Sequence, residues 1–296
     1  MPYAVSNGIK LYYEEVGKGK PLIFVHEFGS DIREWEQQIS WFSREYRCIA
    51  YNARGYVPSD VPNNPEQYGY KHSVEDIANL MRFLKIEKAH VVGLSMGAYA
   101  ALVFGLLYPE MALSIVAAGV GSGAMPEHRK DFASAANNIA DKFIKEGSEI
   151  VGEELGLGSS RIQLKNKDPR AWQKFVNHLK EHSAEGSSFT MKQYQALRPS
   201  LFDFKDDFNK MKVPVLLFLG DEDELCLDIN LFLKRNIPSS GLHIYPRTGH
   251  AINLEEPAFF NSQVHSFLTS VERGHWKQRD KRSDPSQSTT LGLTNE

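Results

Sequence analysis

Residues 90–107 of this chain read HVVGLSMGAYAALVFGLL. The stretch opens on a short apolar run, which is typical of a strand buried on both faces. Met96–Leu107 is rich in small apolar residues and stops before Pro109, which predicts a helix. Between the two lies Gly93-Leu94-Ser95-Met96-Gly97, a match to G-x-S-x-G. The stretch therefore predicts a strand, a sharp turn that carries a serine, and a helix.

The setting of this motif gives it meaning, because a chain of this length holds about 0.1 such matches by chance. A serine on a strained turn between a strand and a helix is exposed to reactants, and small neighbours are needed on both sides of it. Ser95 would then stand at the carboxyl edge of a sheet, above a helix N-terminus. The alternative interpretation is a glycine-rich turn with an incidental serine.

Similar apolar runs recur along the chain, with helical stretches between them. Ser73–Leu84, for example, places its apolar residues on one helical stripe. Strands that alternate with helices predict right-handed crossovers and a mostly parallel central sheet flanked by helices, an α/β fold. Ile9–Val16 follows an Asn-Gly turn and is expected as an antiparallel strand at the edge. The other runs are Leu22–Val25, Cys48–Tyr51, His90–Val92, Ser114–Ala118, Val215–Leu219 and Leu242–Tyr245.

The alternation stops in the middle of the chain, where residues 121–212 carry helical periodicity and little strand signal. We expect a helical cap inserted into a core formed by residues 1–120 and 213–271. Its helices are expected at Glu127–Lys145, Pro169–His182 and Met191–Leu197, joined by hinges at GLGSS and EGSS. Residues 272–296 show no periodicity, so we predict a disordered C-terminal tail.

Composition excludes several classes of protein. The 296 residues are 42% hydrophobic and 24% charged, as in ordinary globular proteins. A net charge of −3 gives no electrostatic attraction for nucleic acid or anionic membranes. Cys48 and Cys226 are too few for a disulfide scaffold, and no signal peptide or membrane span is recognisable. We expect a cytoplasmic protein that acts on a small molecule, with a homodimer left open.

A nucleophilic serine needs a base, and the base needs a carboxylate that orients it. Thr248-Gly249-His250 follows a late strand and supplies the base. Of the ten histidines, His250 has this placement before a helix. Gly220-Asp221-Glu222-Asp223 follows the preceding strand and offers three candidate acids.

The order serine, acid, histidine along the chain resembles that of the α/β-hydrolase fold superfamily. The resemblance covers about residues 8–120 and 213–271 and implies an α/β-hydrolase fold. It also implies Asp223 as the acid, with Asp221 and then Glu222 as alternatives. By this resemblance, His250 takes the Ser95 proton while Asp223 fixes the tautomer of the imidazole.

His26-Glu27-Phe28-Gly29, after another predicted strand, resembles the superfamily's His-Gly-x-x segment. The resemblance implies that the amides of Phe28 and Met96 stabilise the oxyanion. Glu27 departs from the pattern, because a carboxylate near a developing oxyanion would oppose it. We expect Glu27 either to turn away or to select a substrate with a positive or hydroxyl group. The alternative is a tolerated surface substitution.

The segment Asn52-Ala53-Arg54-Gly55-Tyr56 resembles the superfamily's D-x-R-G-x-G-x-S turn, where Arg54 is expected to brace the loop. Together, residues 21–60 resemble esterases, enol-lactonases and non-haem perhydrolases. The Gly-Pro-Gly loop common in ring-fission-product hydrolases is absent, which disfavours carbon–carbon bond hydrolysis.

The sequence therefore predicts a serine hydrolase that cleaves small, mostly hydrophobic esters or lactones through an acyl-enzyme, with no cofactor. The alternatives are a carbon–carbon hydrolase or perhydrolase with the same triad, and a receptor on the same fold. Leu225 and Ala251 should border the cavity by their proximity to the acid and the base. Aromatic residues of the cap are weaker candidates for lining it, namely Trp172, Phe175, Phe143, Phe189 and Tyr194.

Other motifs carry no assigned chemistry. His178-Leu179-Lys180-Glu181-His182 matches H-x-x-E-H, which can face two histidines toward zinc. It falls in the expected cap of a chain that already has a metal-free hydrolytic set, so we predict no metal site. Cys226 is expected as a small buried residue. The basic run RGHWKQRDKR is expected to be solvated, not a nucleic-acid patch.

Overall fold

The computed structural model of the protein describes residues 2–283. Its centre is an eight-stranded sheet with the order β1-β2-β4-β3-β5-β6-β7-β8. The first pairings, β1 with β2 and β2 with β4, are antiparallel, and all the others are parallel. The strands are β1 (Tyr3–Ser6), β2 (Ile9–Val16), β3 (Lys20–Val25), β4 (Tyr46–Tyr51), β5 (Ala89–Leu94), β6 (Ala112–Ala118), β7 (Val215–Gly220) and β8 (Ser240–Tyr245).

The mostly parallel sheet confirms the predicted fold class, and each predicted parallel strand lies within an observed one. The position of Ile9–Val16 at the edge was wrong. The edge strand is Tyr3–Ser6, which pairs with Ile9–Val16 through the predicted hairpin. A four-residue strand is too short to give a clear alternation of apolar and polar residues.

Helices cover both faces of the sheet because successive strand residues point to opposite sides. Ile23 and Val91 belong to one hydrophobic core with helices α2, α3 and α9. Their neighbours Phe24 and Val92 belong to a second core with α1 and α11. The helices of this framework are α1 (Glu36–Phe42), α2 (Tyr70–Phe83), α3 (Met96–Leu107), α8 (Lys205–Lys210), α9 (Glu224–Asn236), α10 (Ile252–Glu255) and α11 (Pro257–Glu272).

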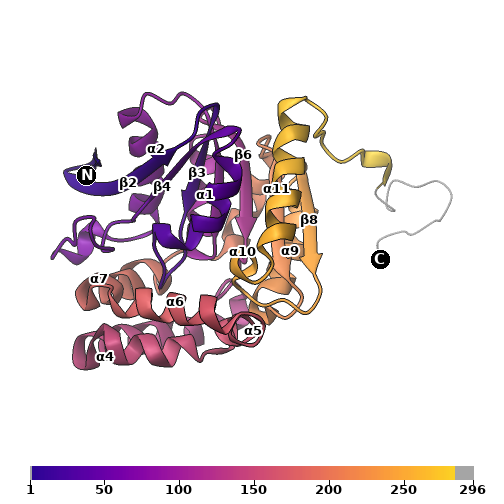
Figure 1. The fold of residues 1–296 in the computed structure, drawn as a ribbon. Helices are drawn as coiled ribbons and strands as arrows, with labels where there is room; N and C mark the ends of the chain where they lie inside the picture. The colour runs from indigo at the N-terminus through magenta and orange to yellow at the C-terminus, as the bar shows by residue number, and fades with distance from the viewer. Residues whose placement is uncertain (1, 284–296) are drawn as a thin grey trace.

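Four further helices form the cap, which follows β6 and lies beside the end of the sheet toward which β8 points (Figure 1). The structure divides the chain differently from the prediction at the end of this insertion. Leu201, Phe208 and Met211 pack in the sheet core, so residues 201–212 belong to the framework and not to the cap. The cap helices are α4 (Arg129–Gly156), α5 (Ser159–Lys167), α6 (Pro169–Lys180) and α7 (Ala184–Phe189), followed by a π-helical turn at Thr190–Gln195.

The two predicted hinges differ in the structure. GLGSS joins α4 to α5, whereas EGSS lies inside α7, so a hinge there was wrong. A Cβ atom on Gly186 would lie 2.0 Å from the carbonyl oxygen of Gly55. Gly186 therefore lets the cap approach the loop after β4. The glycine in the EGSS stretch is needed for close packing and does not mark a break between helices. In that loop Arg54 forms a buried ion pair with Asp76, at 2.6 Å, which agrees with a bracing role.

The C-terminal segment also differs from the predicted tail. Glu272 ends α11, and the ring of Trp276 packs 4.6 Å from that of Phe267. Trp276 Nε1 donates to the carbonyl oxygen of Ser239 at 2.7 Å. The prediction of disorder was therefore wrong for the segment up to Trp276. The side chain of Trp276 docks this segment against the framework. Residues 284–296 of the predicted tail lie outside the described residues.

Replacing Trp276 by alanine should destabilise the protein, because it removes a half-buried aromatic contact and a hydrogen bond. We expect the free energy of unfolding to fall by about 2 kcal/mol, less than for a fully buried tryptophan. Urea denaturation measures the loss. Trp41→Ala is the matched control, since Trp41 is 44% exposed and should change stability little. Equal effects of the two substitutions would mean that the segment is not docked.

Candidate active site

Ser95 lies where the sequence predicts it, between the end of β5 and the start of α3. Its backbone has φ of 51° and ψ of −109°, in the left-handed half of conformational space that non-glycine residues avoid. The strand side of the turn is fixed by a hydrogen bond from the Ser95 amide to Ala118 on the neighbouring strand, at 2.8 Å. Such strain persists only where the surroundings enforce it, and it is concentrated at functional sites.

The two glycines of the motif are required by close packing around this turn. A Cβ atom on Gly93 would lie 2.3 Å from the carbonyl oxygen of Gly97. On Gly97 it would lie 2.1 Å from the carbonyl oxygen of Val25 in β3. These separations leave no room for a side chain, so the glycines bring the helix against the strands and hold Ser95 at the edge.

His250 and Asp223 meet at the same edge, from the loops that follow β8 and β7. His250 Nδ1 lies 2.7 Å from Asp223 Oδ2, and both side chains are buried. Asp221 instead accepts a hydrogen bond from the Thr248 amide at 3.3 Å, and Glu222 is exposed. Of the three candidate acids, Asp223 is therefore the one paired with the histidine.

The imidazole of His250 is surrounded by charges. Burial lowers the pKa of His250, but the charge and hydrogen bond of Asp223 and the charge of Glu27 outweigh burial. Arg161 opposes them, and the balance raises the pKa of His250 above its ordinary 6.5. Ser95 Oγ forms no hydrogen bond to His250 in the described part of the chain. His250 Nε2, the atom that would accept the serine proton, lies instead 3.6 Å from Glu27 Oε2.

Glu27 is a buried residue with charged partners. Its side chain is 1% exposed and forms an ion pair with Arg161, which α5 of the cap supplies. The interpretation as a tolerated surface substitution was therefore wrong. Its carboxylate faces His250 and is paired with a cation of the protein itself. The expectation that it turns away from the oxyanion or selects a substrate group stays a prediction. Arg161 carries no local sequence signal, because its partner lies 134 residues away in the chain.

A second buried carboxyl group, Glu34, lies close to this pair. Burial, and next the charge of Glu27, raise the pKa of Glu34 well above its usual range. Neither of its carboxyl oxygens has a hydrogen-bond partner within the described residues. This shift favours the neutral form of the Glu34 carboxyl group. Glu34 too was missed from the sequence, because a single Glu in an amphipathic segment is typical of a surface residue.

The two predicted oxyanion donors come from the loop after β3, which carries Phe28, and from the first residue of α3, Met96. No protein acceptor in residues 2–283 takes the amide hydrogens of Phe28 and Met96, so both are available. Tyr194 of the cap donates its hydroxyl to the Met96 carbonyl oxygen at 3.0 Å. Beneath Phe28, His26 bridges the Glu27 carbonyl oxygen and the Ala53 amide, and burial lowers the pKa of His26 to about 4. His26 is thus neutral and holds the loop in place.

The predicted substrate-binding residues separate into two groups. Ala251, Trp172 and Phe175 are buried together where the cap meets the loop after β8. Phe175 lies closest to the charged pair, with the Arg161 guanidinium 4.6 Å from the centre of its ring. Leu225 is 61% exposed on the first turn of α9, which does not support a place in the cavity. Asp223, at the N-cap of α9, is buried, whereas Leu225, two residues later, points to solvent.

A cleft of about 420 Å³ opens between α6 and the segment before α1. Glu34 and Phe175 both line it, and the ring of Phe175 also contacts the Arg161 guanidinium, so one wall of the cleft borders the pair of Glu27 and Arg161. Its volume is in the range of small-ligand sites.

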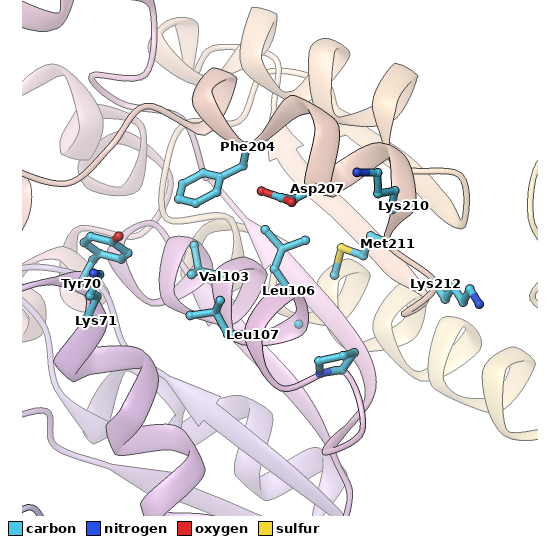
Figure 2. A pocket seen from close by; sticks show the side chains of 12 residues that line it. Tyr70, Lys71, Val103, Leu106, Leu107, Phe204, Asp207, Lys210, Met211 and Lys212 are labelled. Carbon is cyan, nitrogen blue, oxygen red and sulfur yellow. The ribbon is translucent and has the colours of Figure 1, made fainter.

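A second cleft of about 420 Å³ lies between α2, the far half of α3 and α8, with Phe204 and Leu106 facing each other across it (Figure 2). Its nearest residue on α3, Val103, is eight positions beyond Ser95, which corresponds to about 12 Å along a helix. This cleft is therefore separate from the candidate active site.

The other motifs take up structural positions. His182 lies 3.3 Å from Asp31, while His178 lines the cleft beside α6. In residues 2–283, Asp223, Cys226 and His250 have potential metal ligands within 4.8 Å of one another. Burial, and then Asp223, raise the pKa of the Cys226 thiol well above its usual range, which disfavours the thiolate that a metal would need. We therefore interpret these three residues as the paired acid and base, Asp223 and His250, with a neighbouring thiol, and not as a metal site.

Within the described residues, no helix is long and apolar enough to cross a membrane.

The strand order and the serine, histidine and aspartate at one edge are those of a hydrolase. Residues 20–257 match the alpha/beta hydrolase fold family, and the chain belongs to that family. It is 27% identical over 284 residues to a 2-hydroxy-6-oxononadienedioate/2-hydroxy-6-oxononatrienedioate hydrolase of Comamonas testosteroni, covering 89% of this chain and 93% of the relative. It is 24% identical over 255 residues to 3-oxoadipate enol-lactonase 1 of Acinetobacter baylyi, covering 85% and 89%.

Among solved structures, a thermophilic esterase from Thermogutta terrifontis superposes with a TM-score of 0.79 at 23% identity, covering 91% of this chain and 98% of the esterase. These likenesses confirm the predicted superfamily. Their range of reactions leaves the substrate open.

Proposed function

We propose that the protein is a serine hydrolase that cleaves carboxylic esters or lactones of small, mostly hydrophobic substrates. The observation that carries this proposal is the 2.7 Å contact between Asp223 and His250 at the sheet edge where Ser95 stands on a strained turn. An enol-lactonase and an esterase among the relatives support the ester or lactone class.

In the proposed reaction, Ser95 Oγ attacks the carbonyl carbon while His250 Nε2 takes the serine proton. In the neutral imidazole Asp223 accepts from Nδ1–H, so that Nε2 is the nitrogen without a proton, and its charge stabilises the imidazolium that forms. The amides of Phe28 and Met96 stabilise the oxyanion, and His250 then returns the proton to the leaving oxygen. Water, activated by the same histidine, hydrolyses the acyl-enzyme. No cofactor takes part.

The cleft beside α6 supports a small substrate. Phe175 and Leu254 contribute apolar surface to it, and the buried Glu34 lines it together with charged residues such as Arg33 and Lys174. We infer that the substrate enters between the cap and the segment before α1, and that no nucleic acid or membrane is involved. The formation of a homodimer stays an open expectation.

There are three alternatives, and two of them are enzymes that use the same residues. The relative from Comamonas testosteroni supports a carbon–carbon hydrolase, because its name gives an oxononadienedioate as the substrate. A perhydrolase would use the same acyl-enzyme with peroxide in place of water. A receptor with slow or absent turnover is favoured by Glu27, whose charge lies 3.6 Å from the atom that must accept the serine proton.

A substrate panel distinguishes these possibilities. We expect short-chain p-nitrophenyl esters and simple lactones to be hydrolysed, and a fluorophosphonate to label Ser95 and stop turnover. The panel includes a β-diketone and peroxide as tests of the two enzymatic alternatives. Labelling of Ser95 without turnover of any compound would favour the receptor. Turnover that survives complete labelling would contradict the proposed nucleophile.

A further inference from the structure

Four charged or ionisable side chains form a buried row at the candidate active site, from the core to the cap. Asp223 contacts His250 at 2.7 Å, His250 lies 3.6 Å from Glu27, and Glu27 pairs with Arg161. The four residues come from the loop after β7, the loop after β8, the loop after β3 and helix α5. Each is at most 7% exposed, so solvent screens their charges little.

The charges of this row balance in one protonation state of the histidine. Asp223 and Glu27 are each negative and Arg161 is positive, so the row carries −1 with a neutral imidazole and zero with an imidazolium. An uncompensated buried charge is costly, whereas a row of alternating charges is compensated at each contact. The geometry therefore favours a proton on His250 Nε2 that faces the Glu27 carboxylate.

We propose that Glu27 holds a proton on His250 Nε2 in the free protein, and that Arg161 of the cap weakens this hold by neutralising Glu27. Glu27 and Arg161 are thus positioning residues that set the fraction of His250 able to accept the Ser95 proton. When the imidazolium loses its Nε2 proton, one proton leaves to solvent and the lone pair becomes available to Ser95 Oγ. The raised pKa of His250 agrees with this arrangement, since activity then requires a higher pH than for an isolated histidine.

Other ionisable groups near the imidazole do not change the net charge of the row. Burial, and next the charge of Glu27, raise the pKa of Glu34, which favours its neutral form. Glu255 accepts a hydrogen bond from the Gly249 amide at 2.8 Å, and its charge faces Lys167 at 3.7 Å. The Cys226 thiol beside Asp223 is uncharged. The net charge at His250 is therefore determined by Asp223, Glu27 and Arg161.

The row makes opposite predictions for its two outer members. Glu27→Gln leaves zero net charge with a neutral imidazole, so the pKa of His250 should fall. Arg161→Gln leaves two carboxylates, so the pKa of His250 should rise. The double variant Glu27→Gln/Arg161→Gln restores the wild-type net charge of the row, so the pKa of His250 should be close to that of the wild type. General loss of packing would not move the two single variants in opposite directions.

The test is an NMR titration of the His250 imidazole in the full chain, which needs no substrate and so does not depend on turnover. The inference rests on the proposed function only in taking His250 as the base. In parallel, the rate of Ser95 labelling by a fluorophosphonate is measured against pH. For Glu27→Gln we expect that rate to increase about tenfold at pH 6, since a neighbouring carboxylate commonly shifts a pKa by a unit or more.

Glu222→Gln is the matched control, because Glu222 is an exposed carboxylate next to Asp223 and should leave the titration unchanged. Thermal unfolding of every variant checks the fold. If one single variant does not fold, the double variant and the other single variant still show the direction in which the pKa of His250 moves. An unchanged His250 titration in folded Glu27→Gln, or shifts of the same sign in both single variants, would overturn the inference. If titrations move as expected but Ser95 is not labelled, only the proposed function fails.

Discussion

Replacing Ser95 by alanine is expected to lower turnover of any ester or lactone that the wild-type protein hydrolyses by about 10⁴-fold or more. In the proposed mechanism the hydroxyl oxygen forms the acyl-enzyme, and Ser95 has strained backbone angles at the sheet edge. Alanine keeps a Cβ atom at the same backbone angles, so the turn and its hydrogen bond to Ala118 should persist. The fold should be intact, and His250→Ala should produce a loss of similar size.

Steady-state kinetics on purified Ser95→Ala, together with circular dichroism, measure both parts of this expectation. Ser40→Ala is a suitable control, because Ser40 is exposed on α1 and should leave the rate as it is. The mechanism would be abandoned if purified Ser95→Ala kept substantial turnover. A loss of activity accompanied by unfolding would contradict the expectation that the hydroxyl plays no structural part.

Asp223→Asn is expected to lower kcat by about 10⁴-fold, a loss close to those expected for Ser95→Ala and His250→Ala. The carboxylate lies 2.7 Å from His250 Nδ1, and in the proposed mechanism it stabilises the imidazolium formed during the reaction. An amide carries no charge, and its N–H₂ group can hold the imidazole in the tautomer with a proton on Nε2. Nε2 could then no longer accept the serine proton, although the protein would fold with nearly the same shape.

Asp221→Asn provides the matched comparison, since it changes the same group two residues away. Its carboxylate accepts from the Thr248 amide and not from the histidine, so we expect a change within about twofold. Rates measured at several pH values separate a loss of the acid from a shift in the pH optimum. A larger loss from Asp221→Asn than from Asp223→Asn would reverse the assignment of the acid.

Much of the framework follows from local patterns in the sequence. The apolar runs and the helical stripes predict the parallel strands, α2 and α3, because the two faces of a buried sheet and one face of each helix must be apolar. The glycines around Ser95 predict the turn. The weaker predictions concern short elements, such as Tyr3–Ser6, and segments whose composition has two interpretations, such as EGSS, where glycine provides close packing.

Ser95, His250 and an acid after β7 could be found from the sequence because each follows a recognisable strand, and parallel strands end at one edge of a sheet. The contacts of Glu27 could not be found in this way. Its partner Arg161 and its neighbour His250 lie on other elements, and only the docking of the cap brings the three together. The burial of Glu34 and the exposure of Leu225 were decided in the same way, by how neighbouring elements pack.

The sequence by itself determined the alternation of strands and helices, the strained serine turn and the order of the three edge residues, since each depends on residues that are close in the chain. Tertiary structure alone decided which of three acids contacts His250, how far the C-terminal segment docks, and that a carboxylate in the oxyanion loop faces the histidine and a cation of the cap. These depend on distances between side chains far apart in sequence, and burial makes their charges interact strongly.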